Sequence, residues 1–87
     1  MIYLLEAVEN MQVIRATYNN KIRELEVHAV GVGTDGKTLI RDYERYDEFK
    51  LFKYEKLEGI TVLEKTFFIR TEYIENDSAM KIILFQV

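Results

Sequence analysis

The chain has 87 residues, of which 48% are hydrophobic, and its formal net charge is −3 at pH 7. This length and composition indicate one globular domain, residues 1–87, with a single core. Cysteine and proline are absent and histidine occurs once, which excludes a disulfide framework, a cysteine-based zinc site and a histidine-rich metal site. The negative charge argues against a strong DNA binder that relies on many phosphate contacts, but it does not exclude a local basic pocket.

No run in the sequence approaches the ~20 apolar residues of a transmembrane helix. The first residues, Met-Ile-Tyr-Leu-Leu-Glu, lack the basic region and the small-residue cleavage site of a signal peptide. We therefore expect a cytoplasmic protein without a membrane partner.

The first residues predict a short helix. Leu4, Val8 and Met11 recur at helical spacing within residues 2–10. A helix of this length is not stable alone, so it must pack on the rest of the chain. We expect it to cover one end of a sheet; a helix that binds a partner is the alternative.

Alternation of apolar and polar residues then predicts five closely spaced strands, at residues 12–18, 22–32, 37–45, 49–54 and 60–64. The pairs Asn19-Asn20 and Asp35-Gly36 are typical of tight hairpin turns. A polar connection at Tyr46-Asp47-Glu48 precedes the fourth strand. The apolar phase changes near Gly31, which favours a bulge that bends the sheet.

The pattern as a whole predicts a mainly β fold: a small, strongly bent antiparallel sheet or barrel with a short N-terminal helix. Its interior would contain Leu57, Ile60, Val62 and Phe67.

The last part of the chain has a different pattern. Residues 66–78 show no clean period and would wrap the surface, with one helical turn capped by Asn76-Asp77-Ser78. The apolar run at residues 80–87 predicts a terminal strand that covers an exposed edge, in the same chain or in a neighbouring copy. Because residues 82–85 are apolar on both faces, we expect a homo-oligomer.

The ordered set of segments resembles the WYL domain, a small SH3-like or Sm-like antiparallel β-barrel. The resemblance spans nearly the whole chain and implies a single WYL-like domain of about five strands. WYL domains mostly act as ligand-sensing or nucleic-acid-sensing modules beside DNA-binding or defence domains, including those of phage defence. The segments that carry the resemblance are Ala7-Val8, Ile14, Tyr18, Arg23, Glu26-Val27-His28, Leu39-Ile40-Arg41-Asp42-Tyr43, Leu51-Phe52-Lys53-Tyr54-Glu55-Lys56-Leu57, Thr61-Val62-Leu63, Phe67 and Asn76-Asp77-Ser78-Ala79-Met80-Lys81.

The resemblance also implies a ligand-binding surface on which cationic and aromatic side chains gather. Neighbouring arginines and lysines suit a phosphate or another small anion, and tyrosine rings can stack on a base. The alternative is that the cations pair with nearby carboxylates on a solvated face. The candidate residues are Arg23, His28, Arg41, Tyr43, Lys53 and Lys56.

No catalytic constellation is apparent. His28 has no cysteine partner, Ser78 is the only serine, and no carboxylate spacing implies an acid–base pair or a metal site. We therefore expect a protein that is not an enzyme and that uses no cofactor or metal.

The leading functional hypothesis is a non-enzymatic module that recognises a phosphate-bearing nucleotide or a short single-stranded nucleic acid. It would act as a regulator or would sequester a nucleotide signal. The alternative is a protein–protein adaptor that works through its apolar C-terminal strand.

Overall fold

The computed structural model of the protein describes residues 1–45 and 47–87. The described residues form a short N-terminal helix and six strands, which confirms the mainly β prediction. Tyr46, the first residue of the expected polar connection, lies outside the described residues. The elements are α1 (Ile2–Glu9), β1 (Gln12–Tyr18), β2 (Lys21–Val32), β3 (Thr38–Glu44), β4 (Phe49–Lys53), the 3₁₀ turn η1 (Tyr54–Lys56), β5 (Glu58–Thr66) and β6 (Ile82–Gln86).

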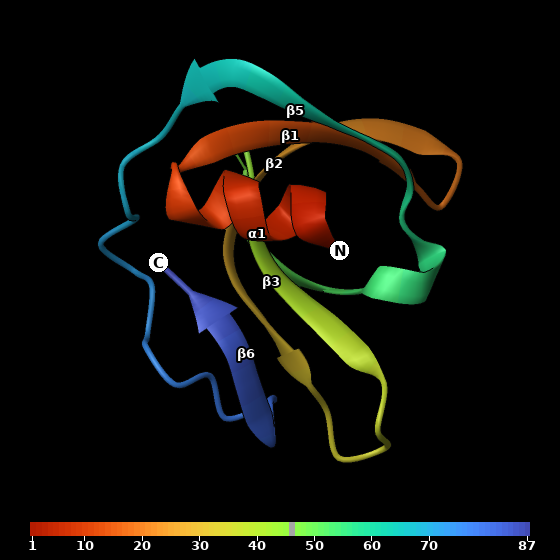
Figure 1. Ribbon diagram of the computed structural model, residues 1–87, viewed down its shortest axis with the longest axis vertical. Coiled ribbons are helices and arrows are strands. Elements are labelled where there is room, and N and C mark those ends of the chain that lie inside the picture. The colour runs from red at the N-terminus through yellow and green to blue at the C-terminus, as the bar shows by residue number, and fades with distance from the viewer. Residues whose placement is uncertain (46) are drawn as a thin grey trace.

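All six strands belong to one antiparallel sheet in the order β4-β3-β2-β1-β5, and β6 pairs with β2. The long strand β2 is central and bent (Figure 1). Its first part pairs with β1 and its last part with β6, whereas β3 lies along its other edge. The order ends at β4 and β5, and strand pairing within the described residues does not close the sheet into a barrel.

Both predicted hairpin turns are confirmed. Asn19 and Asn20 have φ angles of 52° and 61°, the left-handed conformation that a type I′ turn requires at both central residues. In the second turn Gly36 has a φ of 81°, and the Asp35 Oδ1 accepts a hydrogen bond from the Lys37 backbone N–H at 3.0 Å. Asparagine and glycine tolerate this conformation, which explains their place at the turns.

Strand β2 has two register shifts: one in its pairing with β6 between Val30 and Gly31, where the bulge was expected, and one in its pairing with β3 at His28, which was not predicted. Val27 pairs with Asp42 and Ala29 pairs with Arg41, so His28 is an extra residue on β2. An extra residue shifts the alternation of the strand by one position. Residues on both sides of the bulge can therefore point their apolar side chains into the core.

Gly31 also allows a close approach of the C-terminal part of the chain. A Cβ atom at this position would lie 2.4 Å from the carbonyl oxygen of Ile82 and 2.6 Å from the sulfur of Met80. No side chain can be added at this contact without a shift of the β6 backbone. The glycine thus determines how closely β6 packs on β2.

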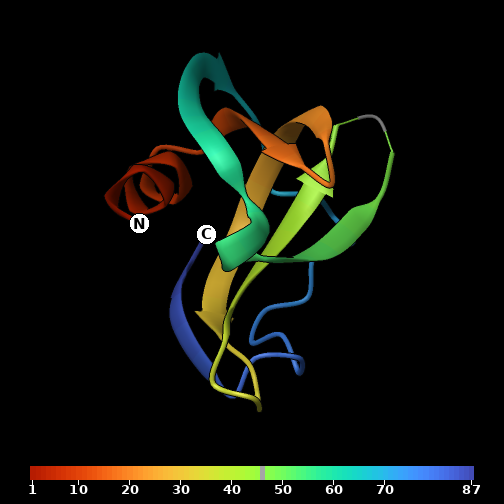
Figure 2. The same ribbon diagram turned by 90° about the vertical axis from the view of Figure 1, so that its right-hand side faces the viewer.

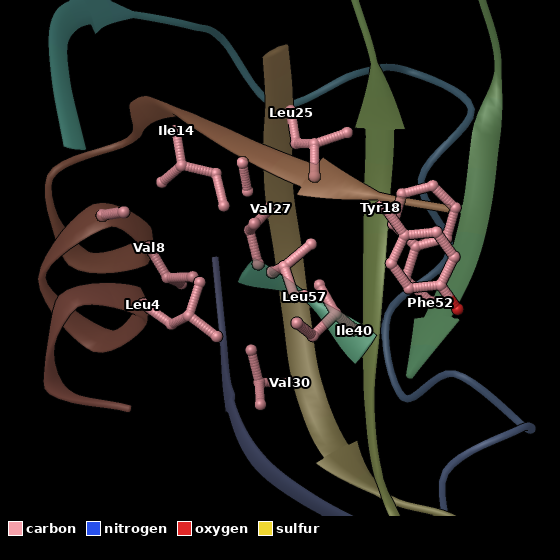
Figure 3. Packing of buried hydrophobic residues seen from close by; sticks show 12 residues of the cluster. Leu4, Val8, Ile14, Tyr18, Leu25, Val27, Val30, Ile40, Phe52 and Leu57 are labelled. Atoms are coloured by element: carbon pink, nitrogen blue, oxygen red, sulfur yellow. The ribbon is translucent and has the colours of Figure 1, made fainter. Parts of the chain in front are cut away.

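The core lies on the inner face of the bent sheet, where α1 covers it (Figure 3). The helix contributes Leu4 and Val8, both fully or almost fully buried. At the far end of the core, the Tyr18 and Phe52 rings stack with centroids 3.9 Å apart and planes 8° apart. The Tyr18 hydroxyl also accepts a hydrogen bond from the Lys53 backbone N–H at 3.1 Å. Side chains therefore connect β1 to β4, which are not paired as strands within the described residues.

The predicted interior residues of the second half of the chain are confirmed in part. Leu57 belongs to the core, and Ile60 and Val62 pack against it. Phe67 is buried as expected, but it lies against the His28 ring at a centroid distance of 5.1 Å. It belongs to a second apolar layer on the other face of the sheet.

That outer face of β2 and β3 is covered by residues 67–81, which form neither helix nor strand and are named here the covering segment. Figure 2 shows α1 on one side of β2 and β3 and the covering segment on the other. The two ends of the covering segment are held by backbone hydrogen bonds, from Phe67 N–H to Met11 O at 2.9 Å and from Lys81 N–H to Val32 O at 2.7 Å. The aperiodic sequence thus wraps the surface, as predicted.

The single turn expected at Asn76-Asp77-Ser78 is present as one hydrogen-bonded turn, in which the Met80 backbone N–H donates to the Asp77 carbonyl oxygen at 3.0 Å, but it is not part of a helix. The Asp77 Oδ1 caps this turn by accepting a hydrogen bond from the Ala79 backbone N–H at 3.0 Å. None of the helices in the described ranges is long and apolar enough to cross a membrane.

Candidate functional site

The six predicted site residues lie on both faces of the sheet and do not share one surface. Arg23 stands opposite the buried Ala16 on the inner face. His28, Arg41 and Tyr43 contact the covering segment or lie beneath it on the outer face. Lys53 ends β4 on the outer face, and Lys56 belongs to η1 and lines a separate hollow with Asn19, Asn20 and Glu58.

Arg23 pairs with a carboxylate, as the alternative hypothesis for the cations predicted. Its Nη1 lies 2.7 Å from Glu44 Oε1, and its guanidinium lies 5.3 Å from the centre of the Phe52 ring. Lys50 Nζ also contacts Glu44, at 2.9 Å. Burial disfavours the charged form of Glu44, but the hydrogen bonds from Lys50 and Arg23 outweigh it and lower the pKa of this carboxyl. The charge of Arg23 is therefore already matched within the fold.

His28 is fully buried and holds the covering segment. Its Nε2 accepts a hydrogen bond from the Arg70 backbone N–H at 3.1 Å, and its Nδ1 lies 2.9 Å from the Glu26 carbonyl oxygen. Since the first contact needs an acceptor and the second a donor, these partners assign the proton of the neutral ring to Nδ1. Burial lowers the pKa of the imidazole from 6.5. The neutral ring thus stabilises the fold above about pH 6.5, and this contribution is lost as the pH falls through the lowered pKa.

Next to His28, a buried ion pair fastens the same segment. Arg70 donates from Nε and Nη2 to the two carboxylate oxygens of Glu26, at 2.7 Å and 2.8 Å. Arg45 Nε lies 3.1 Å from Glu26 Oε2, and the Arg70 guanidinium lies 4.1 Å from the centre of the Tyr43 ring. Glu26 has no exposed surface and Arg70 keeps 31% of its side chain exposed, so the carboxylate side of this two-pronged contact is shielded from water. His28 and Tyr43 are therefore committed to the attachment of residues 67–81.

Arg41 is held by a carboxylate of the covering segment, and part of its side chain remains exposed to solvent. Its Nε lies 2.5 Å from Asp77 Oδ2 and its Nη2 lies 3.3 Å from Asp77 Oδ1. The hydrogen bond from Arg41 lowers the pKa of Asp77, so this pair is ionised. The Arg41 side chain keeps 25% of its surface exposed. No partner for its Nη1 occurs within residues 1–45 and 47–87.

The exposed part of Arg41 lines a cleft of about 280 Å³ between β3, β4 and the covering segment. Phe49 and Tyr73 form its aromatic walls, with ring centroids 6.2 Å apart and an interplanar angle of 35°. The Tyr73 hydroxyl donates to Gln86 Oε1 at 2.7 Å, which fixes the position of this ring. The complete lining is Arg41, Phe49, Glu72, Tyr73, Ile74, Asp77 and Ser78. Such a site fits a flat ring that carries hydrogen-bond acceptors.

Of the six predicted residues, only Arg41 lines this cleft. Sequence reasoning missed Phe49, Tyr73 and Asp77 as site residues. Phe49 could have been predicted from the sequence, because strand alternation places it on the same face of β4 as Lys53. Tyr73 and Asp77 belong to a segment without a period, and their positions depend on contacts with β2, β3 and β6. In the part of the chain that the structure describes, no group of three or more His, Cys, Asp or Glu residues is placed to hold a metal ion.

Fold and site together define a small mainly β domain with a covering helix and a cleft lined by Arg41. Comparison with protein-family models, curated proteins and solved structures finds no match. The similarity to WYL domains therefore stays a prediction from the sequence.

Proposed function

We propose that this chain is a non-enzymatic module that binds a nucleotide or a short single-stranded nucleic acid, with one base in the cleft beside Arg41. The observation that carries the proposal is the state of Arg41: Asp77 holds its Nε and Nη2, while Nη1 has no partner within the described residues. Because Asp77 already fixes this guanidinium, it can donate hydrogen bonds to a ligand without a further loss of side-chain conformational entropy. Phe49 and Tyr73 offer the aromatic surface on which a base stacks.

The phosphates of such a ligand would lie outside the cleft. Asp77 and Glu72 offset the charge of Arg41, so the cleft itself suits a base better than a phosphate. Strand alternation places Phe49 and Lys53 on the same side of β4, about 13 Å apart along the strand. Lys53 has no ion-pair partner within residues 1–45 and 47–87. A short strand with one base at Phe49 would bring a phosphate to this lysine.

The proposal extends to the fold family and to the role of the module. A helix followed by antiparallel strands, with Tyr18 and Phe52 stacked between β1 and β4, supports a WYL-like domain of the SH3-like or Sm-like barrel type. In this hypothesis the protein acts as a regulator or sequesters a nucleotide signal. Native mass spectrometry of freshly purified protein tests it. We expect a nucleotide or oligonucleotide that is released on denaturation, and a heteromeric protein complex without such a ligand would contradict the proposal.

Replacement of Arg41 by alanine is expected to weaken the binding of a short oligonucleotide by ~1.5–3 kcal/mol, the range for a charge-assisted hydrogen bond. Arg41→Lys should also weaken it, because the planar donor fork is lost while the charge is kept. Both variants remove the two-pronged contact with Asp77, so their thermal midpoints should fall too. Fluorescence anisotropy and thermal unfolding separate the two effects.

The matched control is Arg15→Ala, which removes an arginine with 51% of its side chain exposed and a long 3.7 Å contact to Glu24. This variant should change neither affinity nor stability appreciably. If Arg41→Ala lowers the thermal midpoint and leaves the affinity unchanged, Arg41 is only a structural ion-pair partner.

Strand β6 favours a second candidate function, a protein–protein adaptor or a homo-oligomer. Its outward side chains Ile82 and Leu84 are 54% and 49% exposed, and the strand contains no charged residue. Within the described residues, only β2 pairs with it. An uncharged, partly exposed edge strand is a surface on which another chain can pair.

We expect light scattering to show a homo-oligomer, and the Leu84→Lys variant to shift it to the monomer. A wild-type protein that is monomeric at high concentration would contradict this.

A further inference from the structure

We infer that the cleft beside Arg41 selects guanine among the bases, an inference that rests on the proposed function. The selectivity comes from two side chains of opposite hydrogen-bonding character that line the same small cleft, Arg41 and Glu72. The volume of about 280 Å³ lies just below the range of about 300–1,000 Å³ that is usual for ligand pockets. It therefore suits a single base with the sugar and phosphate outside.

Arg41 supplies only donors. Asp77 occupies its Nε and one side of Nη2, and the remaining hydrogens of Nη1 and Nη2 form a second two-pronged edge. Two adjacent acceptors match this edge, and guanine carries them as O6 and N7. The two-pronged contact of arginine with these atoms is the commonest specific contact between proteins and bases in DNA complexes.

Glu72 supplies only acceptors once it is ionised. Its Oε1 accepts a hydrogen bond from the Thr71 hydroxyl at 2.8 Å, and this bond lowers the pKa of the carboxyl. A hydrogen bond from its own backbone N–H lowers this pKa further, so Glu72 stays an acceptor at the rim of the cleft. Guanine presents two adjacent donors, N1–H and the N2 amino group, which match a carboxylate.

The other bases fit this pair of side chains less well. Adenine places its N6 amino group beside N7, so one donor of Arg41 would face another donor. Cytosine carries an amino group where guanine has O6, so a donor would face a donor of Arg41. Uracil has a single N–H between two carbonyl groups, so it offers Glu72 one donor where guanine offers two. Stacking on Phe49 and Tyr73 does not discriminate, because every base has a π-face. The preference must therefore come from Arg41 and Glu72.

The test compares the affinities of four single-stranded tetranucleotides, each of three uridines and one variable base, by fluorescence anisotropy. We expect the guanine-containing strand to bind about tenfold more tightly than the other three, since a good two-pronged pair contributes ~1–3 kcal/mol of discrimination. Glu72→Gln should reduce this preference to a few fold, because the amide presents a donor on one side. Glu72 is exposed, so this variant should fold normally.

The matched control is Glu75→Gln, which changes another exposed carboxylate of the covering segment. Glu75 does not line the cleft, so this variant should keep the full preference for guanine. It tests whether the loss of any carboxylate in the covering segment alters the preference.

Each remaining outcome is decisive. Equal affinity for all four strands would overturn the guanine inference and leave the proposed function standing. No binding of any strand would overturn both. A guanine preference that Glu72→Gln leaves unchanged would overturn the role of Glu72, and a preference that Arg41→Lys leaves unchanged would overturn that of Arg41.

Discussion

Replacement of Glu26 by alanine is expected to lower the free energy of unfolding by about 3 kcal/mol, the lower end for removal of one partner from a buried ion pair. Glu26 has no exposed surface and accepts two hydrogen bonds from Arg70 and one contact from Arg45. Its loss leaves the Arg70 guanidinium without its two-pronged carboxylate partner and removes one contact of Arg45. Because Arg70 keeps 31% of its side chain exposed, water compensates for part of the loss, which places the expected value at the lower end.

Urea unfolding at pH 7 measures this change, and Glu24→Ala is the matched control. Glu24 lies two residues earlier on the same face of β2, but it is 30% exposed and pairs with the exposed Lys65 at 3.2 Å. Its removal should cost less than about 1 kcal/mol. Hydrogen exchange should also become faster in residues 67–81 of Glu26→Ala, since Arg70 fastens that segment. Equal destabilisation by the two replacements would contradict the assignment of the buried pair.

Replacement of Asp42 by asparagine is expected to stabilise the protein at neutral and higher pH. Asp42 is fully buried, and neither of its carboxylate oxygens has a hydrogen-bond partner within the described residues. Burial, and then the neighbouring charge of Glu44, raise the pKa of Asp42 well above 3.8. A group with a raised pKa in the folded state binds its proton more tightly there than in the unfolded chain. The folded protein therefore loses stability as the pH rises from about 4 through the raised pKa.

Asparagine has nearly the same shape and never ionises, so the Asp42→Asn variant lacks this loss. We expect a gain of at least ~1 kcal/mol at pH 8, which raises the thermal midpoint by about 4–8 °C in a domain of this size. At pH 4 the two proteins should be similar, because Asp42 is then protonated. The comparison is made between variants at each pH, since protonation of His28 below pH 6.5 lowers the stability of both.

Glu58→Gln is the control for Asp42→Asn, because Glu58 is an exposed carboxylate. It should leave the thermal midpoint nearly unchanged across the same pH range. A lower thermal midpoint for Asp42→Asn at pH 8 would show that the charged carboxylate has a favourable partner in the folded protein.

The strands could be predicted from the sequence because their signals are local. Alternation in β1 and β3 and the turn residues Asn19-Asn20 and Asp35-Gly36 depend only on neighbours along the chain. The helix could be located because its apolar positions repeat, although Ala7 and not Met11 is buried beside Leu4 and Val8. The irregularity at Gly31 could be predicted because glycine is a common bulge signal, whereas the extra residue His28 is fixed by contacts with distant residues and was not predicted.

The cleft could not be predicted from the sequence for the same physical reason. Arg41 was recognisable as an outward residue of a strand, but its partner Asp77 lies 36 positions later in a segment without periodicity. The alternative that the cations pair with carboxylates holds for Arg23, whose partner is Glu44, 21 positions away. Alternation along the chain places a residue on one face of a strand. The irregular segment that covers that face is determined by contacts between residues far apart in the sequence.

The covering segment has a practical consequence for protein engineering. Arg70 and Asp77 fasten it on either side of residues 71–76. Of the side chains between them, Asn76 is hydrogen-bonded to Gln86 of β6, whereas within the described residues no hydrogen bond or ion pair joins the side chains of Glu72, Ile74 and Glu75 to the sheet. A library that varies Glu72, Ile74 and Glu75 while keeping Tyr73 would display new side chains around the cleft on an unchanged framework, in the manner of an antibody loop. Selection from such a library would turn this small domain into a reagent for other small ligands.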